Sequence, residues 1–183
     1  DKFNLGLAVR AEEYSDFGST TSGKVSARYD FSDKVALRGT VSTGFRAPSL
    51  QQQFFRSTAT NFIGGVPFDI RTFRVNDAAA VALGAEPLKA EESKNLSLGL
   101  VLQPIDNLYV TVDAYRIDID DRIMLSENLT SNAVRAYLNA NVDPALGGGR
   151  YFTNAIDTST KGVDIIATYR WGIGNGTLDL TAG

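Results

Sequence analysis

Residues 24–45, KVSARYDFSDKVALRGTVSTGF, contain two runs in which apolar and polar side chains alternate. The odd-numbered positions are apolar from Val25 to Phe31, and the same alternation resumes at Val35. A period of two is typical of β-strands with one apolar and one polar face. The polar residues 32–34 between the two runs suit a hairpin turn. The stretch therefore predicts an antiparallel hairpin.

The same alternation recurs on both sides of this hairpin, which predicts about seven strands in all. The further runs are residues 3–11, 96–102, 108–123, 163–169 and 178–180. The expected connections alternate in length, with residues 32–34, 104–107 and 171–176 short and residues 15–23, 47–92 and 124–150 long. The fold class that we expect is all-β, an antiparallel up-and-down meander with short helices possible in the long connections.

Local signals refine this expectation. Asp77 is a candidate N-cap for a helix over residues 78–83, and Ser131 or Asn132 for a second short helix. After Tyr115 the parity of the apolar positions changes, which suggests a β-bulge that re-aims the chain.

The composition excludes several classes of function. The chain has 183 residues and a formal net charge of −3, without histidine or cysteine. These absences remove Ser-His-Asp triads, thiol nucleophiles and the usual zinc and haem ligands, so we expect no enzyme activity and no cofactor. An acidic chain is a poor nucleic-acid binder, because phosphate contacts need a basic excess. The apolar run 78–85 is far shorter than the roughly 20 residues of a membrane helix.

Alternation in loop length favours a transmembrane β-barrel over a soluble sheet. The aromatic residues of the apolar face gather at the short-turn ends of their strands, as an interfacial girdle would; they are Phe3, Tyr29, Phe31, Tyr169 and Trp171. The run from Val35 to Phe45 would extend about 34 Å, or about 24 Å when tilted by about 45°, close to the apolar band of such barrels. A soluble β-sandwich with a binding or adhesion role is the alternative, because alternation also suits that architecture.

The polar face carries charged side chains that are predicted to line a water-containing interior and to pair there. The candidates are Arg10, Arg28, Arg38, Arg46, Asp113 and Asp164. Arg46 could pair with Glu91 or Glu92. Asp118, Asp120 and Asp121 lack the spacing of a calcium loop, and pairing with Arg116 and Arg122 is the preferred interpretation.

The connection around residues 51–74 mixes aromatic and arginine side chains. Aromatic rings beside guanidinium groups suit stacking on, and charge pairing with, an anionic ferric chelate or a sugar. The candidate ligand-binding residues are Phe54, Phe55, Arg56, Arg71, Phe73 and Arg74. The alternative is that these aromatic side chains only pack the connection against the barrel wall.

Four stretches in order resemble the barrels of TonB-dependent outer-membrane receptors. They are GFRAPSL at residues 44–50, LKAEESKNLSLGL at 88–100, VDAYRIDIDDRI at 112–123 and FTNAIDTSTKGVDI at 152–165. Ala90 stands where proline is common in that family, and Leu96 where an aromatic residue is frequent. Each stretch is weak by itself, and their shared order makes the resemblance specific.

The resemblance implies a barrel of about 22 strands closed by an amino-terminal plug. Residues 1–183 would be a partial barrel domain, without the plug and without the terminal strand. Such a receptor imports a scarce ligand of the siderophore, cobalamin or oligosaccharide (glycan) class with energy relayed by the TonB complex, which contacts the plug region. The implied location is the outer membrane of a Gram-negative bacterium, with outer-membrane lipid around the barrel. In isolation, we expect such a piece to self-associate through its open strand edges.

Overall fold

The chain forms two compact units in a computed structural model that describes residues 2–15 and 18–183. The first, here called the sheet unit, comprises residues 1–45, 92–119 and 158–183. The second, here called the loop unit, comprises residues 46–91 and 120–157. Each unit is described by itself.

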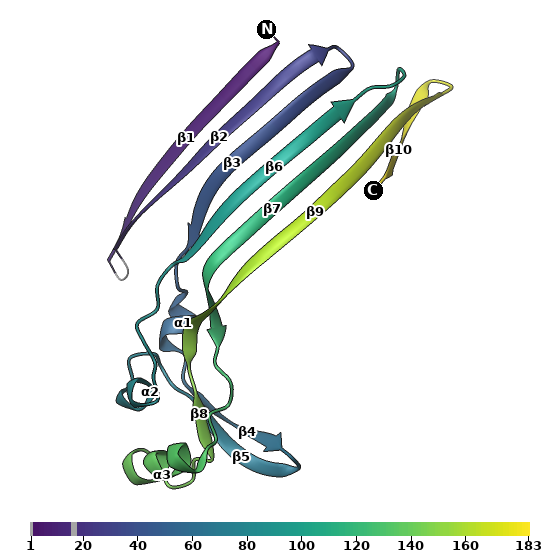
Figure 1. The fold of residues 1–183 in the computed structure, drawn as a ribbon. Helices are drawn as coiled ribbons and strands as arrows, with labels where there is room; N and C mark the ends of the chain where they lie inside the picture. The colour runs from purple at the N-terminus through teal and green to yellow at the C-terminus, as the bar shows by residue number, and fades with distance from the viewer. Residues whose placement is uncertain (1, 16–17) are drawn as a thin grey trace. The chain divides into compact units, whose positions relative to one another are not determined.

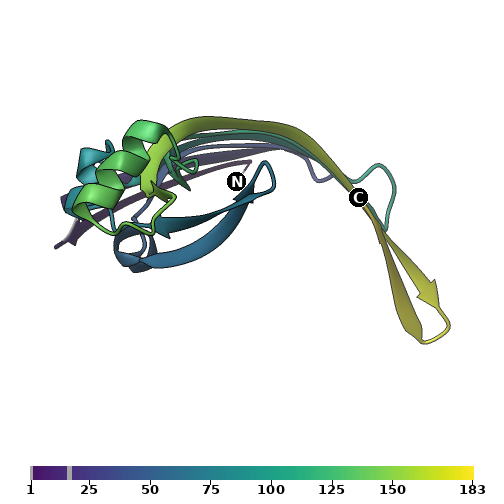
Figure 2. The ribbon, with the colours of Figure 1, turned by 90° about the horizontal axis from the view of Figure 1, so that it is seen from below.

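Seven strands form one sheet in the order β1-β2-β3-β6-β7-β9-β10 (Figure 1). Their bounds are β1 Phe3–Tyr14, β2 Gly18–Ser32, β3 Val35–Arg46, β6 Glu91–Leu102, β7 Leu108–Leu125, β9 Phe152–Ile173 and β10 Gly176–Ala182. Strands that follow one another in the meander are therefore neighbours in the sheet, which confirms the predicted all-β, up-and-down topology. The strands of the sheet unit lie in a single curved layer (Figure 2), an open and incomplete barrel wall.

The strand register keeps the apolar side chains on one face. β1 and β2 pair antiparallel with Leu7 opposite Val25, and β2 and β3 pair with Val25 opposite Val41. The polar positions form the next row, where Arg28 lies opposite Arg38. Because side chains alternate along a strand, this register gives the whole wall one apolar and one polar face.

The apolar face of the sheet unit is open rather than packed against a second sheet. The exposed fractions are 73% for Leu7, 81% for Val9 and 62% for Val163. A sandwich would bury these side chains between two layers, so the soluble-sandwich alternative is wrong. Exposed apolar rows of this length are the surface that a barrel wall presents to lipid.

Two predicted connections are shorter than expected. β2 already begins at Gly18, which pairs with Tyr14, so most of the predicted connection 15–23 is strand; residues 16 and 17 of it lie outside the described residues. Backbone hydrogen bonds carry this pairing, and they do not require an apolar pattern in the Ser- and Thr-rich segment. The final turn is also tighter, because β9 extends to Ile173 and β10 begins at Gly176.

The change in parity after Tyr115 has a different cause from the expected bulge. β7 continues through Tyr115, and Arg116 lines an outward hollow together with Lys94 and Leu96. Arg116 therefore stays on the outward face, where polar side chains replace apolar ones along the strand. A left-handed backbone occurs later, at Asp121 with φ of 56°.

The loop unit contains a small sheet and short helices. Its strands are β4 Ser57–Ile63, β5 Val66–Thr72 and β8 Gly148–Arg150, and its helices are α1 Leu50–Phe54, α2 Ala78–Ala82 and α3 Asn132–Asn141. α2 and α3 were predicted, and Ser131 Oγ accepts a hydrogen bond from the Val134 amide at the start of α3. At α2, Asp77 occupies the N-cap position, but its carboxylate accepts from the Arg74 amide instead of capping the helix. None of the described helices is long and apolar enough to cross a membrane.

The assignment of Val41 to the apolar face and Thr40 to the polar face predicts a large and a small loss of stability for these adjacent residues of β3. Val41→Arg should place a charge against hydrocarbon and lower the free energy of unfolding of the membrane-inserted protein by about 2–4 kcal/mol. Thr40→Arg, on the polar face, should have a much smaller effect. Denaturant titration of the full-length receptor in lipid vesicles would measure both, and equal losses would contradict the assignment.

Candidate functional site

The loop unit joins two long connections that are far apart in the sequence. β4 and β5 form a hairpin in the connection between β3 and β6, whereas β8 lies in the connection between β7 and β9. β5 and β8 pair in parallel, with Ile70 opposite Gly148 and Thr72 opposite Arg150. The Gly147 amide donates to the Asp69 carbonyl at 2.9 Å, which extends this contact. The two connections therefore fold as one body, and this small sheet was not expected from the sequence.

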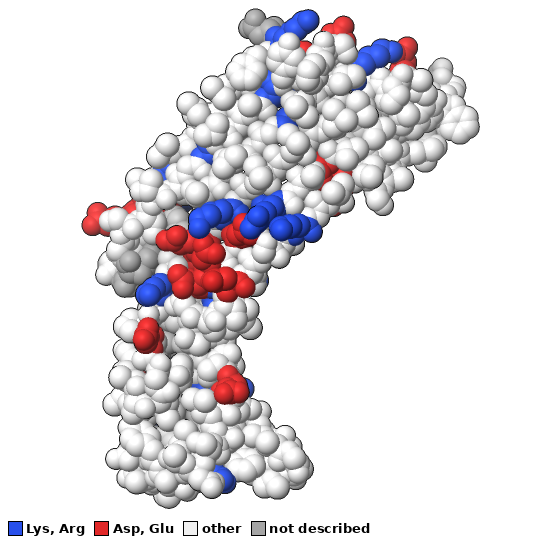
Figure 3. Space-filling view, viewed as in Figure 1, with Lys and Arg blue, Asp and Glu red and all other residues white. Residues whose placement is uncertain are grey.

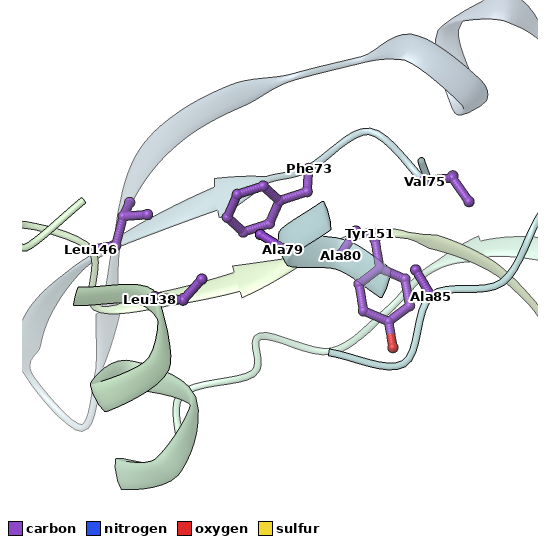
Figure 4. Packing of buried hydrophobic residues seen from close by; sticks show 8 residues of the cluster. All are labelled: Phe73, Val75, Ala79, Ala80, Ala85, Leu138, Leu146 and Tyr151. Atoms are coloured by element: carbon purple, nitrogen blue, oxygen red, sulfur yellow. The ribbon is translucent and has the colours of Figure 1, made fainter. Parts of the chain in front are cut away.

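An apolar core holds this body together (Figure 4). Phe73 and Leu138, which come from different connections, are 1% and 0% exposed. The Tyr151 hydroxyl donates to the Leu83 carbonyl at 3.0 Å, so the polar end of this buried side chain has a partner. The loop unit thus has an interior of its own, which restricts the positions of the side chains on its surface.

Three consecutive glycines, residues 147–149, make the close contact between the connections possible. A Cβ atom at Gly148 would lie 2.6 Å from the Leu129 carbonyl oxygen and 2.8 Å from Ile70 Cδ1. At Gly149 it would lie 2.7 Å from the Phe73 ring. These distances are too short for a real side chain. Glycine is therefore required at both positions, because the backbone approaches its neighbours closely.

An ion pair also crosses between the two connections. Arg71 Nη2 lies 2.9 Å from Asp143 Oδ2, and Arg71 Nε donates to Thr58 Oγ1 at 3.0 Å. The Ala145 amide and then the Arg71 guanidinium hold the pKa of Asp143 below its usual value, because both stabilise the charged carboxylate. This contribution to stability is present above the usual carboxyl pKa and is lost as the pH falls through the lowered one.

A carboxylate clamp ties together the strand ends that lie in the loop unit. Arg46 Nε donates to Glu91 Oε2 at 2.8 Å, and Arg46 Nη2 also pairs with Glu91. The Ile123 amide donates to Glu91 Oε1 at 2.8 Å. The Glu91 side chain is only 6% exposed. One buried carboxylate therefore connects the end of β3, the start of β6 and β7, which confirms Glu91 as one of the two predicted partners of Arg46.

The predicted ligand-binding residues divide into surface and buried positions. Phe54 and Phe55 are 51% and 41% exposed, and Arg56 and Arg74 are also exposed. Phe73 is 1% exposed and belongs to the core, so its ring is not available to a ligand and the packing interpretation applies to it.

The predicted charges of the polar face pair mainly along the wall of the sheet unit. Nε and Nη2 of Arg38 donate hydrogen bonds to the two carboxylate oxygens of Asp113, at 2.8–3.1 Å. Arg28 lies 2.8 Å from Asp30, and Arg10 pairs with Glu12. Asp164 lies on β9 with an exposed side chain. Arg46, the remaining candidate, belongs to the clamp in the loop unit.

The carboxylates of residues 118–121 do not form a metal centre. Asp118 Oδ2 lies 2.8 Å from Arg116 Nε, which agrees with the predicted pairing of this carboxylate with Arg116. Among the described residues, no group of three or more acidic side chains is arranged to hold a metal ion.

Comparison with known families identifies this architecture. The family model for the TonB-dependent receptor-like β-barrel matches residues 1–183. The chain belongs to the TonB-dependent receptor family. A curated relative, the probable TonB-dependent siderophore receptor PirA of Acinetobacter baumannii, is 26% identical over 144 residues, which cover 77% of this chain and 18% of the relative.

Solved structures of other proteins similar to this chain share the fold. The siderophore receptor PirA of Pseudomonas aeruginosa matches with a TM-score of 0.67 and 15% identity, over 99% of this chain and 32% of that one. A variant of the ferric enterobactin receptor PfeA of the same species, in complex with enterobactin, matches with a TM-score of 0.67 and 17% identity, over 98% and 24%. The RagAB peptide importer matches with a TM-score of 0.59 and 12% identity, over 98% and 20%. This TonB-dependent receptor chain therefore spans at most about a third of the proteins that it matches.

The glycine contact predicts a local loss of stability in the loop unit. Gly148→Ala should separate β5 from β8, because the added methyl group meets a backbone carbonyl. Limited proteolysis of the full-length receptor should show faster cleavage between residues 126 and 151. Gly172→Ala is the matched control, since a Cβ atom there has no heavy atom within 4 Å. Unchanged cleavage in the first variant would contradict the close-contact argument.

The clamp predicts a stability difference between single and double substitution. Arg46→Met should lower the free energy of unfolding by about 1–3 kcal/mol, because it removes the charged partner of a buried carboxylate. Adding Glu91→Gln should recover part of this loss, since no buried charge remains and the side-chain amide oxygen can still accept from the Ile123 amide. Denaturant unfolding of the refolded receptor would test both, and a double variant weaker than the single one would overturn the explanation.

Proposed function

We propose that the receptor containing this chain imports a ferric siderophore and that the loop unit captures it. The chain belongs to a family of receptors and transporters, and the relatives reported above include siderophore receptors. The fold by itself does not select the ligand, because the RagAB peptide importer shares it. The choice of ligand class therefore rests on the relatives together with the chemistry of the loop surface.

The observation that carries the proposal is the exposed segment at residues 54–56. Phe54 and Phe55 present aromatic surface beside the cation Arg56. The Phe55 amide donates to the Gln51 carbonyl at 2.9 Å, and Ser49 and Gln52 form a capping box at the start of α1, so the segment follows an ordered helical turn. Aromatic faces and a guanidinium group together suit an anionic iron chelate, by stacking on its planar ligand groups and pairing with its charge.

Arg74 is a second exposed cation of the loop unit. It follows Phe73, which anchors this part of the chain in the core of the loop unit. Arg71 is engaged by Asp143 and Thr58, so we assign it to holding the two connections together rather than to ligand contact.

The proposed mechanism is capture followed by transport through the barrel. The loop residues bind the chelate, and movement of a plug, driven by the TonB complex, opens the path across the outer membrane of a Gram-negative cell. The charged polar face of the sheet unit supplies a hydrated wall for that path. This chain contributes binding and positioning, and we propose no covalent step and no cofactor.

Substitution of the exposed segment tests the proposal. In the full-length receptor, Phe55→Ala and Arg56→Gln should each weaken binding of a ferric siderophore by about tenfold, because each removes a stacking or charge contact worth about 1–2 kcal/mol. Ferric enterobactin is the first probe, with binding measured on intact cells at low temperature and uptake measured after warming.

Lys34→Gln is the matched control for the loss of a cation. Lys34 lies in the short connection between β2 and β3, at the end of β3 opposite Arg46. Its substitution should leave binding unchanged. Import of cobalamin or of an oligosaccharide instead of any ferric siderophore by the parent receptor would overturn the proposed ligand class.

A further inference from the structure

One edge of the small sheet in the loop unit is open. The strand order is β4-β5-β8, and among the described residues β4 pairs with no strand other than β5. The opposite edge is covered, because Leu129 and Gly149 exchange two backbone hydrogen bonds, at 2.9 and 3.1 Å, on the side of β8 that faces away from β5. The residues of β4 are exposed except Asn61, which is half-buried. The free side of β4 is therefore where this sheet can accept another strand.

The pairing of β5 shows which backbone groups lie at this edge. The Asp69 carbonyl accepts a hydrogen bond from the Gly147 amide beside β8 at 2.9 Å. Because successive residues of a strand direct their backbone groups to opposite sides, the even-numbered residues of β5 face β4. The register pairs them with odd-numbered residues of β4, for example Ile70 with Ala59. The even-numbered residues of β4 therefore direct their backbone groups to the open edge; they are Thr58, Thr60 and Phe62.

β4 lacks the features that protect an edge strand from further pairing. Its sequence, STATNFI, has no charged residue and no proline, and its register with β5 runs without a bulge. The hairpin turn has φ of 57° at Gly64 and 82° at Gly65, as a tight two-residue turn requires. The outer end of the hairpin is uncharged in the space-filling view (Figure 3, lower right). Exposed edges are usually interrupted by charges, proline or bulges, so β4 is an ordered strand suited to pairing.

Phe62 adds an aromatic side chain at the open edge. It is 74% exposed, and Val66 beyond the turn is 54% exposed. Side chains on neighbouring strands pack against one another, so a strand added beside β4 would cover the Phe62 ring. The edge therefore offers both backbone hydrogen bonds and an apolar contact to an extended segment.

We propose that an extended segment from another long connection of the same receptor pairs with the open edge of β4. Two connections of this chain already meet in this way, through β5 and β8. Because the chain spans at most about a third of the proteins that it matches, the parent receptor can contribute further connections. A segment of the same polypeptide has a high effective concentration at β4, which favours it over a separate protein. This pairing does not depend on which ligand the receptor imports.

Photo-cross-linking in the full-length receptor identifies the occupant of the edge. The photoreactive amino acid p-benzoylphenylalanine replaces Phe62, and peptide mass spectrometry locates the residue to which it links. We expect a residue of the same polypeptide outside residues 1–183. The same replacement at Val81, an exposed residue of α2, is the control and should not give this product. A link to a separate protein, a product of twice the receptor's mass, or no link outside residues 1–183 would overturn the proposal.

Two substitutions of Thr60 separate backbone pairing from side-chain packing. Thr60→Pro and Thr60→Val both remove the hydroxyl group that donates to Asp69 at 2.6 Å. Only proline also removes the N–H group at the open edge, and an edge strand tolerates proline there. In the receptor labelled at Phe62, Thr60→Pro should lower the cross-link yield by about tenfold, because the added strand loses a hydrogen-bond partner. Thr60→Val should leave the yield unchanged, and equal yields in the two variants would overturn the proposal.

Hydrogen exchange tests the same pairing without any substitution. In the full-length receptor, the Thr58 and Thr60 amides should exchange as slowly as those of Ala59 and Asn61, which face β5. Both groups should be at least about 100-fold slower than an unstructured peptide, because each amide is then in a ladder. Fast exchange confined to Thr58 and Thr60 would show an open edge and contradict the proposal. Ferric siderophore binding is measured separately, so a failure of the proposed ligand class would leave these exchange rates unchanged.

Discussion

Backbone pairing under a strict alternation of side chains is the constraint on which the sheet unit depends. Leu7, Val25 and Val41 lie opposite one another across three strands, and a shift of one residue in any pair would carry charged side chains to the apolar face. Those charges would then meet hydrocarbon, at a cost of several kcal/mol each. The same register brings Arg38 within reach of Asp113 on the polar face. Pairing of the charges on the polar face and the absence of charge from the apolar rows of β1, β2 and β3 thus have one origin.

The loop unit depends on a different constraint, because long connections without an interior would leave the side chains proposed to bind ligand loosely positioned. Parallel pairing of β5 with β8, the core around Phe73 and the contact between Arg71 and Asp143 join the two connections. The glycines at residues 147–149 permit this approach. For the proposed capture by Phe55 and Arg56, an ordered loop unit is an advantage, since less conformational entropy is lost when a ligand binds.

The two ends of the strands in the sheet unit differ in chemistry. Aromatic side chains such as Trp171 mark the short-turn ends, whereas Lys94 stands near the start of β6, where a long connection leads in. An aromatic ring suits an interface of mixed polarity, and a cation suits a surface rich in phosphate. The side chains that border the apolar band of the sheet unit therefore distinguish its two ends.

The sequence alone was sufficient for the seven strands of the large sheet, their order and the family, because a period of two and the stretches at residues 44–50 and 88–100 are local signals. It also indicated α2, α3 and the pairing of Arg46 with Glu91. The capping box of Ser49 and Gln52 is a further local signal, which marks the start of α1. The burial of Phe73, the partnership of Arg71 with Asp143 and the meeting of β5 with β8 were decided only by the tertiary structure. These contacts join residues about seventy positions apart, and no local pattern specifies which distant segments meet, because that choice depends on how the whole loop unit packs.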